Sequence, residues 1–105
     1  MKKNIEVLEN DKDLRSEDFY VKLKESLEEA HTFPTEYIFK YVVPSDHNSI
    51  AQVSAVFSKA NPSVSTRESK TGKYTSITLR VHVNSADEVI TYYQEAAKIK
   101  GIVSL

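Results

Sequence analysis

Two groups of polar residues have types and spacing that suit ligand binding. The first is Asp46-His47-Asn48-Ser49, a run of helix-capping residues directly before a helical pattern that starts at Ile50. The first amides of a helix have no partner within the helix, so this segment is a candidate site for an anion such as the carboxylate of a small metabolite. Ordinary capping of the helix by the same side chains is the alternative interpretation.

The second group lies on one side of a predicted strand. From residue 76 to 83 polar and apolar residues alternate strictly, which is typical of a strand with one buried and one wetter face. With Lys40 from a second predicted strand, the polar positions form a candidate partner-binding face. These positions are Ser76, Thr78, Arg80 and His82.

The sequence contains no set of residues that predicts catalysis. There is no Cys, which excludes thiolate metal ligands, Cys nucleophiles and disulfides. The three His residues fall in separate segments, without the spacing of a metal site. Phosphate-binding glycine loops, dinucleotide fingerprints and nucleophile elbows are also missing. We therefore expect no enzymatic activity, no cofactor and no metal.

Length and charge place further bounds on the protein. The 105 residues suffice for one domain with a real core. No apolar run approaches the about 20 residues that span a bilayer, and no signal sequence follows Met1, so we expect a cytoplasmic protein without membrane contact. Residues 1–30 hold six Lys/Arg and nine Asp/Glu, a balance of −3; residues 31–105 hold eight and six, a balance of +2.

The patterns along the chain predict an α+β fold. Residues 1–15 are polar and expected to be mobile, and residues 16–105 are expected to form one domain that begins with an amphipathic helix over 16–31. The order that follows is βαββαβ, as in ferredoxin-like folds: a four-stranded antiparallel sheet with two helices on one face. The strands are expected at 36–43, 63–69, 74–83 and 102–105, and the helices at 50–60 and 87–99.

In this fold the side chains opposite the helices form an open sheet face. Lys40, Arg80 and His82 give this face a modest basic character. RNA is nevertheless a disfavoured partner, because Thr78 and Arg80 occupy positions at which RNA-binding domains of this fold carry aromatic residues. Ile38 and Val42 fall on the same face. An exposed apolar patch there would be covered by the N-terminal helix, a second copy of the chain or another protein.

Two resemblances add to this interpretation. The segment from Asp46 to Phe57, which follows a strand, resembles the opening of ACT domains, ferredoxin-like regulatory modules that bind amino acids at subunit interfaces. ACT domains typically have a glycine at the turn from loop to helix, where this chain has Ser49. The resemblance implies a small ligand near Asp46–Ser49.

From Leu23 to the end, the chain is similar to the YbeD-like family of small bacterial proteins. The resemblance rests on Leu27-Glu28, on Phe33-Pro34-Thr35 and on a hairpin motif; Thr71 lengthens the turn of that hairpin by one residue. It implies a ferredoxin-like, ACT-like fold, an uncharacterised function with a suggested regulatory link to lipoate metabolism, and no catalytic residues. The hairpin residues are Ser69, Lys70, Gly72, Tyr74 and Ser76.

These observations together predict a non-enzymatic regulatory or interaction module. It would act by sensing a small ligand, or by binding a protein partner or a second copy of itself through the sheet. The alternatives are a small acylphosphatase-like enzyme and a weak nucleic-acid binder. The first needs an arginine in a loop near the first strand, yet none lies between Arg15 and Arg67; the second is disfavoured by the net charge of −1.

Overall fold

The computed structural model describes residues 17–105. The expected mobile segment 1–15 and Ser16, the first residue of the expected helix, lie outside this range. The described residues belong to two compact units, one that ends at Thr32 and one that comprises Phe33–Leu105. Each unit is described by itself.

The first unit contains helix α2, Glu17–Ala30. Phe19, Leu23 and Leu27 recur every four residues along it, the spacing of one helix face. The last turn is closed by the amide of His31, which donates to the carbonyl of Leu27 at 2.9 Å. The described part of this helix, Glu17–Ala30, lies within the range 16–31 in which the sequence predicts a helix.

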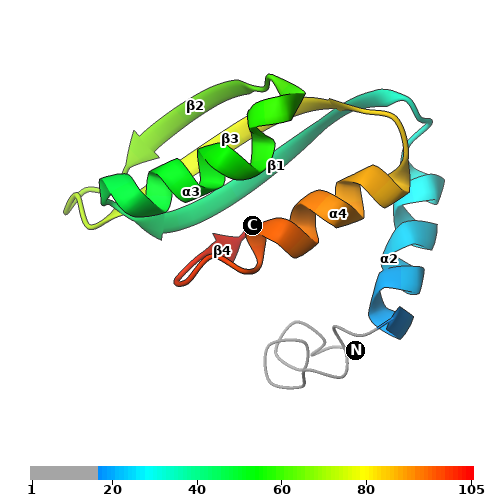
Figure 1. Ribbon diagram of the computed structural model, residues 1–105, viewed down its shortest axis with the longest axis horizontal. Helices are drawn as coiled ribbons and strands as arrows, with labels where there is room; N and C mark the ends of the chain where they lie inside the picture. Colours follow the sequence, from blue (N-terminus) through cyan, green and yellow to red (C-terminus); the bar gives the residue numbers. More distant parts are fainter. Residues whose placement is uncertain (1–16) are drawn as a thin grey trace. The chain divides into compact units, whose positions relative to one another are not determined.

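The second unit is built on a four-stranded antiparallel sheet (Figure 1). Its strands are β1 (Thr35–Pro44), β2 (Ser63–Glu68), β3 (Tyr74–Val83) and β4 (Val103–Ser104). The spatial order β2-β3-β1-β4 is compatible with the predicted ferredoxin-like fold. β1 is central, as its β-branched and aromatic residues predict, while polar β2 and short β4 form the edges.

Two helices connect the strands. Helix α3 (His47–Phe57) continues into a short 3₁₀ turn, η2 (Ser58–Ala60), and helix α4 (Ala86–Ala96) follows β3. Both pack on the same face of the sheet, since rings from each contact Phe39 of β1. Both helices are shifted toward the N-terminus: α3 spans His47–Phe57 rather than residues 50–60, and α4 spans Ala86–Ala96 rather than residues 87–99.

The core lies between the sheet and these helices. The predicted alternation in β3 is confirmed, because Ile77, Leu79, Val81 and Val83 are all at most 2% exposed. An aromatic cluster fills the space above β1: the Phe39 ring lies 4.9 Å from Phe57 of α3 and 5.7 Å from Tyr92 of α4. Aromatic rings at these separations add to the stabilisation from burial.

A tight hairpin joins β2 to β3. The amide of Ser69 donates to the carbonyl of Tyr74 at 2.8 Å, and the amide of Gly72 donates to the carbonyl of Ser69 at 2.9 Å. Gly72 has a φ of 76°, a left-handed conformation that glycine adopts at little cost. The predicted turn is therefore confirmed, and it fixes the register of β2 against β3.

Candidate functional site

The open face of the sheet is the side opposite α3 and α4. Directly paired residues of neighbouring antiparallel strands share a face, so the register decides which side chains lie there. Lys40 pairs with Thr78, Ile38 with Arg80, and Glu36 with His82. Val42 and Arg67 both pair with Ser76 from opposite sides. The five predicted face residues, Lys40, Ser76, Thr78, Arg80 and His82, are therefore brought together.

Two shallow hollows lie on this face. The first has a volume of about 420 Å³ and is lined by Lys40, Ser65, Arg67, Thr78 and Leu105, among others. We call it the lysine–arginine hollow. It contains two positively charged side chains, several hydroxyl groups and, among the described residues, no acidic side chain.

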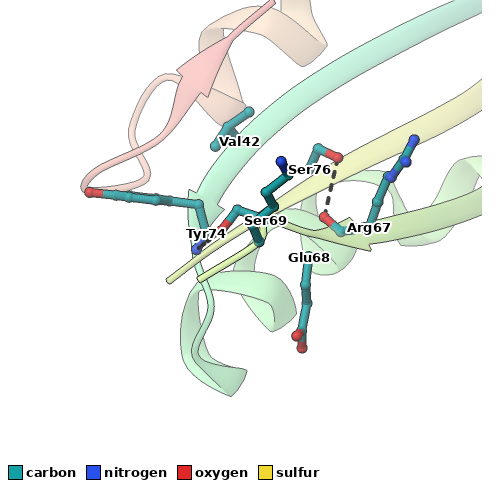
Figure 2. A pocket seen from close by; sticks show the side chains of 7 residues that line it. Val42, Arg67, Glu68, Ser69, Tyr74 and Ser76 are labelled. Atoms are coloured by element: carbon teal, nitrogen blue, oxygen red, sulfur yellow. Dashed lines mark hydrogen bonds between the residues drawn. The ribbon is translucent and has the colours of Figure 1, made fainter. Parts of the chain in front are cut away.

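The second hollow lies at the hairpin end of the same face and has a volume of about 380 Å³ (Figure 2). Val42 and Tyr74 give it an apolar lining, so we call it the valine–tyrosine hollow. Arg67 and Ser76 line both hollows, which are therefore neighbours. The Ser76 hydroxyl donates to the carbonyl of Arg67 at 3.3 Å, a bond that ties β3 to β2 between the hollows.

Apolar side chains are also exposed on this face. Ile38 of the central strand β1 is 43% exposed. Val103 and Leu105, at the β4 edge of the sheet, are 53% and 70% exposed. Val103 pairs with Val42, and the Leu105 amide donates to the carbonyl of Lys40 at 2.9 Å. Exposed apolar side chains of β1 and the β4 edge therefore lie beside Lys40 of β1, Arg67 of β2 and Arg80 of β3, a combination that suits contact with another molecule.

The cations of the face differ in their partners. Arg80 lies 3.6 Å from the Glu36 carboxylate, and both side chains are more than half exposed. Within residues 17–105, no carboxylate forms a salt bridge with Lys40 or Arg67. These two charges are thus available to an anionic partner. Sequence patterns missed Arg67, because β2 is exposed on both faces and shows no alternation of burial.

The hairpin motif has a structural role that its sequence already suggested. The Ser69 hydroxyl accepts the amide of Tyr74 at 3.2 Å, which stabilises the turn. Lys70 lines the valine–tyrosine hollow together with Ser69 and Tyr74. The motif therefore both closes the hairpin and shapes one end of the open face.

The second predicted site, Asp46–Ser49, lies at the start of α3. The Asp46 carboxylate accepts the Ser49 amide at 2.6 Å and the Ser49 hydroxyl at 3.2 Å. His47 and Asn48 are exposed, and Ser49 is buried. An amide that was expected to attract a ligand is thus bound by the chain's own carboxylate, and a ligand at this helix start stays a prediction.

Two tyrosines between the sheet and the helices, the buried Tyr41 and the partly buried Tyr93, have the most strongly shifted pKa values among the described residues. Burial, with a smaller contribution from neighbouring Tyr37, raises the pKa of Tyr41 well above its usual range. Burial, together with the hydrogen bond between Tyr93 and Tyr37, does the same to the pKa of Tyr93. Both groups stay neutral near pH 7, so the aromatic core carries no charge.

The described residues offer neither a metal site nor a membrane span. Across residues 17–105, no three His, Cys, Asp or Glu side chains gather closely enough to hold a metal ion. In the same range, the helices are too short or too polar to cross a bilayer.

Comparison with known proteins identifies the family. The family described as "Protein of unknown function (DUF493)" matches residues 28–105. The chain belongs to the DUF493 family, also named UPF0250. This confirms the resemblance to the YbeD-like proteins, and it covers the whole sheet with α3 and α4.

Curated members of the DUF493 family extend the match. The UPF0250 protein of Shewanella baltica is 37% identical over 83 residues, covering 76% of this chain and 94% of its own length. Those of Shewanella putrefaciens and Shewanella oneidensis are 36% and 35% identical over the same shares. No solved structure matches the chain significantly. The family names state no activity, so function must be argued from the open face.

Proposed function

We propose that this DUF493 protein is a non-enzymatic interaction module that binds a partner protein through the open face of its sheet. The observation that carries the proposal is the pairing of exposed apolar side chains with cations that lack a carboxylate partner in the described chain. The exposed apolar side chains are Ile38, Val103 and Leu105, and the cations are Lys40 and Arg67.

The energetics favour this face over the rest of the second unit. Burying apolar surface contributes roughly 25 cal/mol per Å², so covering three exposed aliphatic side chains gives a binding partner a substantial gain. The surrounding cations would orient that partner and speed its association. α3 and α4 already use the opposite face for the core.

The absence of catalytic activity is part of the proposal. Its support is that, among the described residues, no hydroxyl that lines the hollows has a hydrogen bond to a His, Asp or Glu side chain, and the Ser76 hydroxyl donates to a backbone carbonyl. An acylphosphatase-like activity needs an arginine in a loop near β1, and Arg67 and Arg80 lie within the strands β2 and β3 instead. We also retain the expected cytoplasmic location.

Sensing of a small ligand at the start of α3 is the weaker candidate. An anion there would have to compete with Asp46 for the Ser49 amide. A bound carboxylate would also be repelled by the Asp46 side chain, since like charges at close range disfavour each other.

Affinity capture with matched variants tests the proposal. The full chain, its Lys40→Glu/Arg67→Glu variant and a Lys59→Glu/Lys98→Glu control are immobilised, and proteins retained from the native host are identified. Both variants change the charge by the same amount, but Lys59 and Lys98 lie outside the open face. We expect a protein retained by the wild type and the control, and lost from the open-face variant.

Other outcomes have distinct meanings. Equal retention by all three chains contradicts binding through the open face. A dimer in light scattering that only the open-face variant disrupts identifies a second copy of the chain as the partner. Turnover of acetyl phosphate by the wild type, lost in the Arg67 variant, contradicts the non-enzymatic part of the proposal.

A further inference from the structure

We infer that the partner presents an extended acidic segment in which a carboxylate and an apolar side chain are two residues apart. The carboxylate enters the lysine–arginine hollow, and the apolar side chain enters the valine–tyrosine hollow. This inference rests on the proposed function and names the chemistry of the partner.

The lysine–arginine hollow is suited to a carboxylate. The Arg67 guanidinium offers a planar fork of donors that matches two carboxylate oxygens, and the Lys40 ammonium adds a second positive charge. Hydroxyls of Ser65 and Thr78 line the same hollow and can donate further hydrogen bonds. The two cationic side chains outnumber the one carboxylate at the hollow, the α-carboxylate of Leu105, so the hollow favours an anion over a cation.

The valine–tyrosine hollow is suited to an apolar side chain. Val42 and the Tyr74 ring supply its apolar surface, and Tyr74 is 53% exposed. Figure 2 shows the side chains of Tyr74 and Arg67 pointing to opposite sides of Ser76. Glu68 also borders the hollow, but its side chain points away from Val42 in this view, and it pairs with Thr75 on the helix-covered side of β3.

The arrangement of the hollows explains why an extended segment fits. In an extended chain, side chains two residues apart project to the same side. Arg67 and Ser76 separate the two hollows and line both. A segment with the pattern acidic–any–apolar therefore presents one group to each hollow at once, whereas a single small anion would occupy only the first.

Charge and apolar exposure together favour a peptide over a nucleic acid. Residues 31–105 carry a balance of only +2, too small for the phosphate neutralisation that dominates nucleic-acid binding. Exposed Leu105 and Val103 at the far edge offer contacts to further aliphatic side chains, which a phosphate backbone lacks.

Titration of the ¹⁵N-labelled full chain with synthetic peptides tests the inference. The probe is a capped peptide of about nine residues. Serine occupies every second position, and glutamate and leucine take turns at the positions between the serines. One control replaces glutamate by lysine, a second replaces leucine by alanine, and a third titration uses sodium phosphate alone. We expect saturable shifts of amide signals in β1, β2 and β3 with the probe, and at least about tenfold weaker binding with either control peptide.

Variants test the assigned residues. Arg67→Gln removes the charge of the fork with little change in size, and we expect it to weaken probe binding by about tenfold, as loss of one charge-assisted hydrogen bond predicts. Val42→Ser should weaken the glutamate–leucine probe but leave the alanine control unchanged. Lys59→Gln serves as a matched control that should bind like the wild type. An amide spectrum of each variant verifies that it is folded.

The failure of this inference can be separated from failure of the proposed function. Equal binding of the lysine peptide overturns the inference, and so does phosphate binding as tight as that of the probe. If no peptide binds but affinity capture still depends on Lys40 and Arg67, the open face binds proteins and only the acidic segment is wrong. If capture does not depend on these residues either, both proposals fail.

Discussion

The hydroxyl oxygens of Tyr37 and Tyr93 lie 3.0 Å apart, so a hydrogen bond joins the central strand β1 to helix α4. Their rings meet nearly at right angles, with centroids 6.3 Å apart. This contact fixes α4 over the aromatic cluster at the end of the sheet where β1 begins. It links residues 56 positions apart in the chain, which local sequence patterns cannot reveal.

Replacement of either tyrosine by phenylalanine should lower the stability of the second unit. A typical hydrogen bond contributes about 1 kcal/mol, and each single variant removes this bond while the other hydroxyl stays partly buried. In a double-mutant cycle measured by urea unfolding, we expect Tyr37→Phe and Tyr93→Phe to show a coupling of about 0.5–1.5 kcal/mol. Strictly additive losses would show that the hydrogen bond contributes nothing.

Tyr41→Phe should have the opposite effect. The Tyr41 side chain is 1% exposed, and its hydroxyl has no hydrogen-bond partner among the described residues. A buried polar group without a partner costs about 1–3 kcal/mol, while the ring itself packs well against Phe39. We expect the variant to be at least as stable as the wild type in urea unfolding; a loss above about 1 kcal/mol would reveal a hydrogen bond to this hydroxyl.

Alkaline pH should destabilise the second unit through its buried tyrosines. Burial raises the pKa of both Tyr41 and Tyr93 in the folded state from the usual 10.0. The folded chain therefore binds more protons than the unfolded chain above this pH, and stability falls as pH rises past about 10, by up to about 1.4 kcal/mol per unit and group. Below that pH these groups add no pH dependence.

The same variants supply the control for this pH effect. Tyr41→Phe and Tyr93→Phe each remove one titrating group, so each should make the loss of stability between about pH 10 and pH 12 less steep. Lysines titrate in the same range, but they contribute equally to all three chains and cancel in the comparison. Identical slopes for wild type and variants would contradict the assignment to buried tyrosines.

Much of the fold follows from patterns that are local in the sequence. The alternation in β3 fixed which side chains are buried, because a half-buried strand has a period of two. A Ser followed three residues later by a Glu, as in Ser85 and Glu88, is typical of a helix start, and the Ser85 hydroxyl accepts the Glu88 amide at 3.2 Å. The reciprocal bond of a capping box differs slightly, since the Glu88 carboxylate accepts the amide of Asn84 instead.

The candidate site was only partly predictable, for physical reasons. Arg80 could be assigned to the open face because polar and apolar residues alternate in β3, and Lys40 because it is the one charge inside the otherwise apolar β1. Arg67 could not, since all of β2 is exposed and its face depends on the register set by the hairpin. The hollows themselves arise from side chains of separate strands, and their sizes depend on distances that no single segment determines.

The exposed ion pair on the open face should matter little for folding. Arg80 and Glu36 lie 3.6 Å apart with side chains 52% and 60% exposed, and such pairs contribute about 0–1 kcal/mol. Arg80→Ala should therefore change the free energy of unfolding by less than about 1 kcal/mol while weakening partner binding. A loss above about 2 kcal/mol would instead assign Arg80 a structural role. Glu36→Gln is the matched control, which removes the pair but retains the arginine.

Variants of Asp46 distinguish capping from ligand binding at the start of α3. Its carboxylate accepts the Ser49 amide, so Asp46→Ala should destabilise the second unit by about 1 kcal/mol, within the range of 0.5–2 known for lost helix caps. Asp46→Asn retains an acceptor oxygen and should lose less. Urea unfolding of both variants measures the difference.

The same variants show whether this helix start has a second role. A capping residue should affect stability alone, so both variants should retain partner capture once the temperature is low enough for full folding. An Asp46→Ala chain that is as stable as the wild type would mean that the carboxylate contributes nothing to the cap. In that case the predicted site at Asp46–Ser49 regains priority over the open face, because an anion at the Ser49 amide would no longer displace a stabilising bond to Asp46.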